Sequence, residues 1–429
     1  MGVSVANSVA SRHVIKPTTN MNLEPKGPNP ISPSSGSANT PTTINKPEST
    51  TWAFDLHLMS HFTTRTVYTF SSYPTLVNAW QTIIRDAVSQ PFLLHGILAI
   101  AALHLASTPR YPDDDDDDDN EFTTHEYIRA FQYHQSEAIP QYRKILQSFD
   151  LIGDAEFDIR SREPWPAGPA YAMGFLTGMT AAAEVSDNSP SIYLEQERDG
   201  MTAASAITPP AHSPSMGKGA RLEDIFDRFM SIFIATRGVR AVVKAALEAG
   251  TFQNTIYRHL IGPVKESDHL PAVPIEAEFS EWYDKFRTEC LNDLASESSK
   301  REVCAAAITC LQEVHDGAAR LLELKRERLG HVQGDRRLLY DFGWLLKWTA
   351  IVGQEFLALV RQRQDAALVV LAQFAAICKM AEDEWYMKNW VKNAIDAIRH
   401  MLGPGKAMEW VDRIVHRWAR EEAVPGVIL

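Results

Sequence analysis

The sequence predicts an all-α protein, built as a large irregular helical bundle behind a disordered N-terminal tail. Two observations lead to this prediction. Apolar residues recur at helical spacing through most of the 429-residue chain, and no segment shows sustained alternation of apolar and polar residues. The hydrophobic fraction of 45% is sufficient for a large buried core. No repeat at a fixed period stands out, so a regular solenoid is not expected.

The domain organisation is indicated by shifts in composition along the chain. Residues 1–50 are rich in Ser, Thr, Pro, Asn and Gly, so they bury too little apolar surface to offset the entropy lost on ordering. We expect a linker-like tail there and a helical domain over 51–429, with flexible loops near 108–122 and 186–220. The first loop contains seven consecutive aspartates, Asp113–Asp119, whose mutual repulsion favours an exposed loop. The second is rich in Pro and Ser.

The individual helices are indicated by apolar spacing and by turn residues at their ends. The run Phe92–Ala106 contains 15 mostly apolar residues, and Pro91 before it suits the first turn of a helix. A membrane span needs roughly 20 apolar residues, so we expect a buried helix here and no membrane span. The other expected helices are Phe54–Tyr68, Leu76–Val88, Thr123–Gln147, Tyr171–Ala183, Leu222–Leu247, an apolar stripe from Trp344 to Leu359, and another from Trp410 to Trp418.

Charge and cysteine content argue against two classes of protein. The net charge is −12, and the basic groups are short and have acidic neighbours. A protein that binds nucleic acid on its own usually carries a basic stripe, which this chain lacks. The cysteines, Cys290, Cys304, Cys310 and Cys378, stand too far apart for a disulfide framework or a structural zinc site. We expect buried free thiols.

Motifs for enzymatic chemistry are absent from the sequence. It contains no GxGxxG, no GxxxxGK[ST] and no GxSxG pattern. His95 and His104 lie nine residues apart on the predicted buried helix, which puts them on opposite faces and excludes an i, i+4 metal-binding pair. We expect both to be core histidines with satisfied hydrogen bonds. The sequence therefore predicts no catalytic residue, no cofactor, no metal site and no enzyme.

Several segments resemble the fungal-specific transcription factor domain, and the closest type is that of sterol uptake control proteins. The most specific segment is Pro91–Ala106, which reads PFLLHGILAIAALHLA. The resemblance covers about 52–420 and is strongest at its two ends. The other segments that carry it are Leu56–Thr64, Trp80, Tyr133–Ala138, Trp385-Tyr386, Trp390 and Trp410.

The resemblance implies an all-α regulatory domain that acts in the nucleus. Part of the protein could also reside in the cytoplasm. It implies a transcriptional regulator of a sterol or secondary-metabolite pathway, with a protein partner or a homodimer and a possible sterol-like or other lipid ligand. The family carries a cluster of closely spaced zinc-binding cysteines before this domain, whereas the first cysteine here is Cys290. We therefore expect no direct DNA contact. Three explanations stay open: a lost cluster, a missed exon, or a partner that contacts DNA.

A ligand of this kind would need an apolar pocket with few polar anchors. Two apolar helix faces are the candidate walls. One is the apolar face of Phe92–Leu105, and the other is the stripe from Trp344 to Phe356. The alternative for each side chain is ordinary core packing. The candidate wall residues are Phe92, Leu93, Ile97, Trp344, Trp348 and Phe356.

Two further classes of function remain as alternatives. One is an all-α enzyme of the terpene-synthase type, which binds magnesium diphosphate through two acidic motifs. The run Asp113–Asp119 is similar to the first motif, and Asn292–Ser296 matches the first half of the second. The final glutamate of that motif is replaced by Lys300, whose charge would repel the metal ions. The other alternative is a non-catalytic ligand-binding or scaffold protein.

Overall fold

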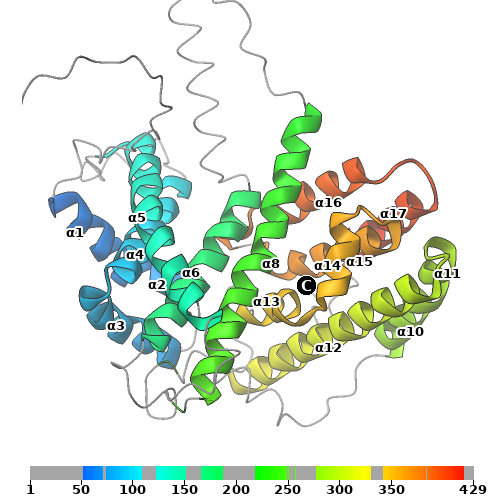
Figure 1. Ribbon diagram of the computed structural model, residues 1–429, viewed down its shortest axis with the longest axis horizontal. Coiled ribbons are helices and arrows are strands. Elements are labelled where there is room, and N and C mark those ends of the chain that lie inside the picture. The colour runs from blue at the N-terminus through cyan, green and yellow to red at the C-terminus, as the bar shows by residue number, and fades with distance from the viewer. Residues whose placement is uncertain are drawn as a thin grey trace, which may run out of the picture. The chain divides into compact units, whose positions relative to one another are not determined.

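A computed structural model of the chain describes residues 52–70, 74–108, 122–150, 166–186, 218–248, 250, 257, 277–329, 342–382 and 384–419. All regular elements in these ranges are helices, as the sequence predicts (Figure 1). They belong to one compact unit, Ile44–Leu429. The predicted tail over 1–50 and most of the predicted loops near 108–122 and 186–220 lie outside the described residues.

The first helical stretch, predicted over Phe54–Tyr68, is divided into three parts. It comprises α1 (Trp52–His61), a π-helical segment η1 (Phe62–Thr66) and α2 (Val67–Phe70). The hydroxyls of Thr63 and Thr64 both donate to the carbonyl of Ser60, at 2.9 and 2.8 Å. Back-bonding of this kind offers the backbone carbonyl a second donor, which accompanies local distortion of a helix. The next helix, α3, spans Pro74–Ser89.

Helices α4 (Pro91–Ser107) and α5 (Thr124–Asp150) pack against each other along much of their length. Pro91 occupies the first turn of α4, as predicted. A capping box starts α5: the backbone N–H of Thr123 donates to the Glu126 carboxylate at 2.7 Å, and the N–H of Glu126 donates to the Thr123 hydroxyl at 3.3 Å. The two groups satisfy donors that the first helical turn leaves unpaired.

Small residues allow α6 (Ala167–Val185) to approach its neighbours closely. A β-carbon added to Gly174 would lie 2.6 Å from the Tyr142 hydroxyl of α5 and 2.6 Å from a Val239 methyl of α8. No side chain larger than hydrogen fits there without a shift. Helix α8 spans Lys218–Glu248 and packs along α6.

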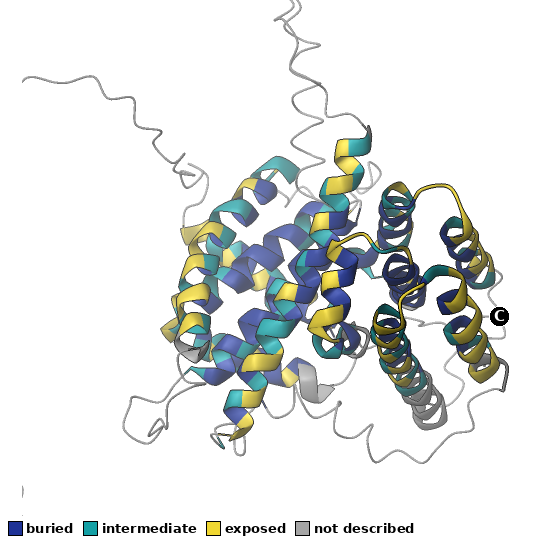
Figure 2. Cartoon of the chain, turned by 45° about the vertical axis from the view of Figure 1, so that its right-hand side comes forward, coloured by how far each residue is buried: buried dark blue, intermediate teal, exposed yellow. Residues whose placement is uncertain are grey.

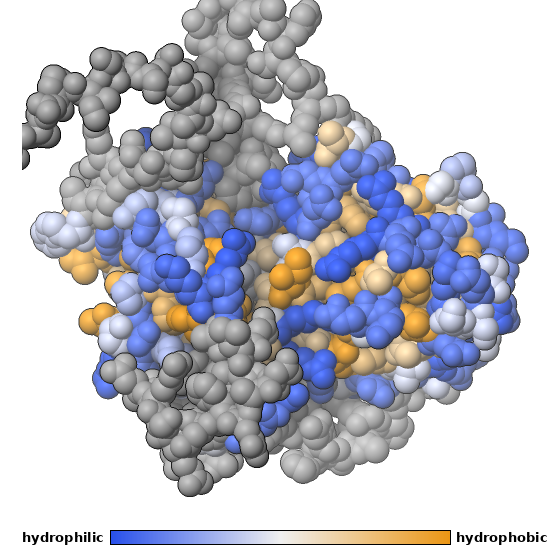
Figure 3. Space-filling model, viewed as in Figure 1, coloured by the Kyte–Doolittle hydropathy of each residue, from blue (hydrophilic) through white to orange (hydrophobic). Residues whose placement is uncertain are grey.

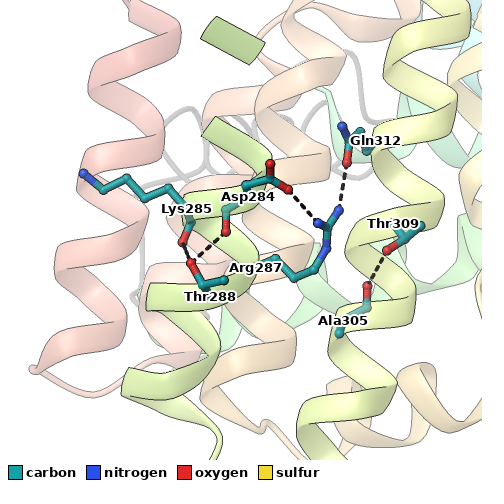
Figure 4. A network of polar contacts seen from close by, with 7 residues as sticks. All are labelled: Asp284, Lys285, Arg287, Thr288, Ala305, Thr309 and Gln312. Atoms are coloured by element: carbon teal, nitrogen blue, oxygen red, sulfur yellow. Dashed lines mark hydrogen bonds and ion pairs between the residues drawn. The ribbon is translucent and has the colours of Figure 1, made fainter. Parts of the chain in front are cut away.

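The next part of the chain is held together by polar contacts as well as by its core. It comprises α10 (Ala277–Lys285), η4 (Phe286–Cys290), α11 (Leu291–Leu294) and α12 (Ser298–Leu329). Figure 4 shows the guanidinium of Arg287 donating to the Asp284 carboxylate at 2.9 Å and to the Gln312 side chain at 2.8 Å. The second bond ties η4 to α12.

The apolar stripe predicted from Trp344 to Leu359 does not lie on one helix. The structure places it on α13 (Phe342–Ile351) and α14 (Gln354–Arg361), with Gly353 in extended conformation between them. Arg237 donates to the Val352 carbonyl, and Arg240 donates to the Ala350 carbonyl at 3.1 Å. These two side chains of α8 satisfy carbonyls at the end of α13, which compensates for the break in the helix.

A second buried helix, α15 (Asp365–Ile377), was not singled out from the sequence. Every residue after Asp365 in this helix is buried. Figure 2 shows buried residues in dark blue, and they face the interior of the helical bundle. The amphipathic helices α16 (Trp390–Met401) and α17 (Lys406–Ala419) both pack on it. Two short 3-10 segments, η6 (Cys378–Ala381) and η7 (Trp385–Met387), connect α15 to α16. Among the described helices, none is both long and apolar enough to cross a membrane.

Candidate functional site

The first predicted pocket wall is part of a closely packed core. Phe92, Leu93 and Ile97 of α4 are all buried, with at most 3% of each side chain exposed. The ring of Phe92 stacks on that of Tyr142 in α5, with centroids 6.3 Å apart. Burial of this hydroxyl raises the pKa of Tyr142. The contacts here are those of helix packing.

The second predicted wall lies around Trp348, which is completely buried on α13. Its ring stacks on Phe374 of α15 at 4.7 Å and meets the edge of Phe356 at 5.6 Å. The indole N–H donates to the Ala307 carbonyl of α12 at 3.1 Å, so the polar atom of this tryptophan has a partner. The side chain of Trp344 lies outside the described residues.

The two predicted walls have different packing partners. Helix α4 packs against α1, α5 and α6, whereas α13 packs against α8 and α12, and α6 and α8 pack on each other. Phe92 and Trp348 thus belong to separate groups of aromatic contacts within the core. The ligand pocket inferred from sequence remains a prediction, since neither group of described side chains borders a described cavity.

A cavity of about 220 Å³ lies elsewhere, among α15, α16 and α17. Its lining combines apolar side chains with charged residues at the edge. The sequence signal for it was present, because Val415 and Trp418 belong to the predicted apolar stripe of the last helix. What the sequence did not indicate is that α16 and α17 leave space between them on α15.

The histidines of α4 have partners on different elements, as their opposite helix faces predict. The Nδ1 atom of His104 lies 3.2 Å from Nε2 of His61 and 3.0 Å from the hydroxyl of Thr66. The imidazole of His104 also stacks on the indole of Trp385, with centroids 4.7 Å apart. Burial lowers the pKa of His104 to about 3, with the positive charges of His61 and Arg65 as lesser causes. Burial likewise lowers the pKa of His61 to about 4, with the charges of His57 and Arg65 as lesser causes. Both rings are therefore neutral at pH 7.

His95 faces α5, where its Nδ1 lies 2.9 Å from Nδ1 of the fully buried His134. The other nitrogen of His134 lies 3.5 Å from a carboxylate oxygen of Asp55 on α1. A hydrogen bond between the two Nδ1 atoms requires one imidazole to donate and the other to accept. On α1, Nε2 of His57 lies 3.0 Å from the Tyr127 hydroxyl, and burial lowers the pKa of His57. The expected hydrogen-bond partners of His95 and His104 are present, but both residues are half-buried at the edge of the core.

Asp293, the acidic residue of the terpene-synthase-like segment, has partners on α17. Its carboxylate accepts hydrogen bonds from the Lys406 ammonium at 3.0 Å and from the Trp410 indole N–H at 3.2 Å. These two hydrogen bonds lower the pKa of Asp293. Lys300 forms an ion pair with Glu297, three residues earlier, at 2.8 Å. Asp293 therefore joins α11 to α17, whereas Lys300 makes a local contact at the start of α12. The run Asp113–Asp119 lies outside the described residues.

The four cysteines are free, as predicted. Cys290, Cys304 and Cys378 are buried, and burial raises the pKa of each thiol, to about 11 for Cys304. Raised pKa values mean unreactive thiols at pH 7. No group of three metal-ligating side chains is close enough to hold a metal ion within the part of the chain that the structure describes.

The chain matches no protein-family model, and no match is found among curated proteins or solved structures. A function can therefore be inferred only from the residues of this chain and their contacts.

Proposed function

We propose that the chain is a transcriptional regulator: an all-α regulatory domain of the fungal zinc-cluster type that acts in the nucleus on a sterol or secondary-metabolite pathway. In this proposal its DNA contacts come from a partner protein, because the chain's own cysteines are separate, and three of the four are buried. A sterol-like or other lipid ligand is a further part of the proposal.

The proposal is supported by contacts at α4 between several segments that resemble the fungal-specific transcription factor domain. His104 of the most specific segment contacts His61, and His95 of the same helix contacts His134. Trp385, from the tryptophan-rich segment near the end of the chain, stacks on His104. Segments that match a family pattern by chance would be scattered over the structure. Here Leu56–Thr64, Trp80, Tyr133–Ala138 and Trp385 pack at or near α4, which supports a shared core arrangement. Trp390 and Trp410 pack instead on Phe229 and Phe286.

The test is a reporter assay with the full chain fused to an unrelated DNA-binding domain. We expect reporter transcription to change at least severalfold. In a strain from which the gene is deleted, we expect altered transcripts of a defined set of genes. Fluorescently tagged protein should accumulate in the nucleus. Unchanged transcripts in the deletion strain, together with an unaffected reporter, would refute the proposal.

A matched pair of variants shows whether an effect needs the folded domain. Ala102 is completely buried in α4, and Ala241 is exposed on α8. An aspartate at position 102 places an unpaired charge in the core, so Ala102→Asp should abolish the reporter effect. Ala241→Asp should leave it unchanged. Equal activity of the two variants would mean that the effect comes from residues outside this helical core.

A further inference from the structure

The three last long helices of the chain enclose a groove with an apolar lining. Val391 of α16 and Val415 of α17 are only half-buried there, so the groove opens to the outside. The space-filling view of Figure 3 shows hydrophobic atoms between hydrophilic ones on the right of the molecule, where Figure 1 places α14 to α17. Apolar surface of this kind is stabilised by an apolar cover. The apolar residues of the groove are Ala376, Val391, Ile395, Val415, Trp418 and Ala419.

The size of the groove favours a segment of the chain itself over a separate molecule. Its volume of about 220 Å³ lies below the range of roughly 300–1,000 Å³ that is typical of small-molecule sites, and it provides room for a few aliphatic side chains. A separate molecule that buries so little surface must still lose its translational and rotational freedom. A segment tethered beside the groove has an effective concentration in the millimolar range, so a small apolar contact is enough to hold it.

The charges at the edge of the groove balance one another. Arg399 is paired with the Asp412 carboxylate at 2.6 Å, and the ammonium of Lys392 lies 3.8 Å from the carboxylate of Asp396. The other two charged side chains of the lining are one lysine and one glutamate. The edge therefore has no net charge, and it favours an occupant whose side chains are apolar and uncharged.

The chain continues from the wall of the groove with a segment of this kind. Ala419 lines the groove and is the last described residue of α17. The ammonium of Lys379 donates to the backbone carbonyl of Trp418 at 3.3 Å, which holds this end of α17 beside the groove. Residues 420–429 follow, outside the described residues. The first three of them are charged, and the last seven read AVPGVIL, without a charged side chain.

The segment is long enough to reach along the whole groove. Ten residues in extended conformation span about 33 Å, at roughly 3.3 Å per residue. Val391 and Arg399, the first and last lining residues of α16, lie eight residues apart along a helix, which is about 12 Å. The dipeptide Pro425-Gly426 is typical of a type II turn, and such a turn brings Val424 and Val427 together as one apolar group.

We propose that residues 423–429 fold back into the groove of α15, α16 and α17 and bury their aliphatic side chains against Val391, Ile395 and Val415. The segment then covers this apolar surface and keeps other apolar peptides out of the groove. The groove is in this way an interaction surface for the chain's own C-terminal segment, whether or not the helical domain regulates transcription.

Photochemical cross-linking tests the position of the segment in the full chain. Leu429 is replaced by a diazirine analogue of leucine, and cross-linked peptides are identified by mass spectrometry. Cross-links from this position should fall within one chain and map to the groove segments 376–382, 390–399 and 415–419. The same analogue at Leu247, which is 42% exposed on α8, is the control and should not label these segments. Cross-links confined to other segments, no cross-links, or equal labelling from both positions would overturn the proposal.

A matched pair of triple variants shows which side chains of the segment hold it in the groove. Hydrogen exchange in 390–399 and 415–419 should become severalfold faster in the apolar variant and stay unchanged in the charged variant, because only the apolar side chains cover the groove. Equal exchange rates in the two variants would contradict the proposal. The apolar variant combines Val427→Ser, Ile428→Ser and Leu429→Ser, and the charged variant combines Arg420→Ser, Glu421→Ser and Glu422→Ser.

The cross-linked product also distinguishes the chain's own segment from that of a second copy. Cross-links within one chain leave its mass in a denaturing gel unchanged, as the proposal requires. A covalent dimer joined between position 429 and the groove would identify the segment of a second copy as the occupant and overturn the proposal. These measurements use purified protein, so they can succeed or fail independently of the reporter assay.

Discussion

The imidazole of His104 stacks on the indole of Trp385, with ring planes 19° apart and centroids 4.7 Å apart. The same indole donates its N–H to the hydroxyl of Thr69 at 3.0 Å. One side chain from the loop between α15 and α16 thus joins α4 to α2. The contact connects the N-terminal helices to the C-terminal ones through a single aromatic residue.

Substitution of Trp385 tests this connection. Trp385→Phe keeps a ring for stacking and loses the hydrogen bond to Thr69, which should lower the free energy of unfolding by about 1 kcal/mol. Trp385→Ala also loses the stack on His104 and should cost about 2–4 kcal/mol. Trp52 is 76% exposed, so Trp52→Ala should change stability by less than about 0.5 kcal/mol. The measurement is urea denaturation, and equal costs for Trp385→Ala and Trp52→Ala would contradict the prediction.

Two glycines of α6 should respond to alanine in opposite directions. A β-carbon at position 174 would lie 2.6 Å from atoms of Tyr142 and Val239, so Gly174→Ala should destabilise the protein by about 1–3 kcal/mol. A β-carbon at position 178 would lie 3.6 Å from Leu346, an ordinary contact. Gly178→Ala should therefore stabilise the protein by up to about 1 kcal/mol through helix propensity. Thermal unfolding distinguishes the two, and destabilisation of equal size at both positions would refute the close-approach argument.

The buried histidines predict a loss of stability at mildly acidic pH. Unfolded histidine has a pKa near 6.5, and burial lowers the folded pKa to about 4 for His61 and His315 and to about 3 for His104. Below pH 6.5 the unfolded state binds more protons than the folded state. The stabilisation is therefore present above pH 6.5 and is lost as pH falls toward 4, by at most about 1.4 kcal/mol per pH unit for each histidine.

Denaturation midpoints at pH 7.5 and pH 5.0 measure this loss. His104→Gln removes one of the titrating rings and should make the difference between the two midpoints smaller. The exposed His400 serves as the control, and His400→Gln should leave the difference as it is in the unmodified protein. A variant lacking His104 with an unchanged pH dependence would show that this ring does not contribute.

The capping box at the start of α5 should contribute to stability through its hydroxyl. Thr123→Ala removes the oxygen that accepts from the N–H of Glu126 and should cost about 1 kcal/mol. Thr123→Ser keeps this oxygen and should be close to neutral. If serine is as destabilising as alanine in urea denaturation, then packing of the threonine methyl group, and not the cap, stabilises this helix end.

For the predicted pocket walls, the sequence predicted burial of the side chains but not how they are grouped. The burial of Phe92, Leu93, Ile97, Trp348 and Phe356 follows from their spacing and is observed. Their division between two groups of packed aromatic rings could not be predicted, because it depends on which helices come between them. The groove beside Trp418 was missed for the same reason, since a cavity is a property of three helices together.

Three features follow from the amino-acid sequence alone: the chain is helical, most helices lie where they are observed, and His95 and His104 point to opposite sides of α4. Spacing along one helix is a local property, so it can be read from neighbouring residues. The packing of the helices sets which partners those faces meet: His134 for His95, and His61 with Trp385 for His104. These partners lie far away in the chain, and local periodicity does not specify how distant helices are arranged.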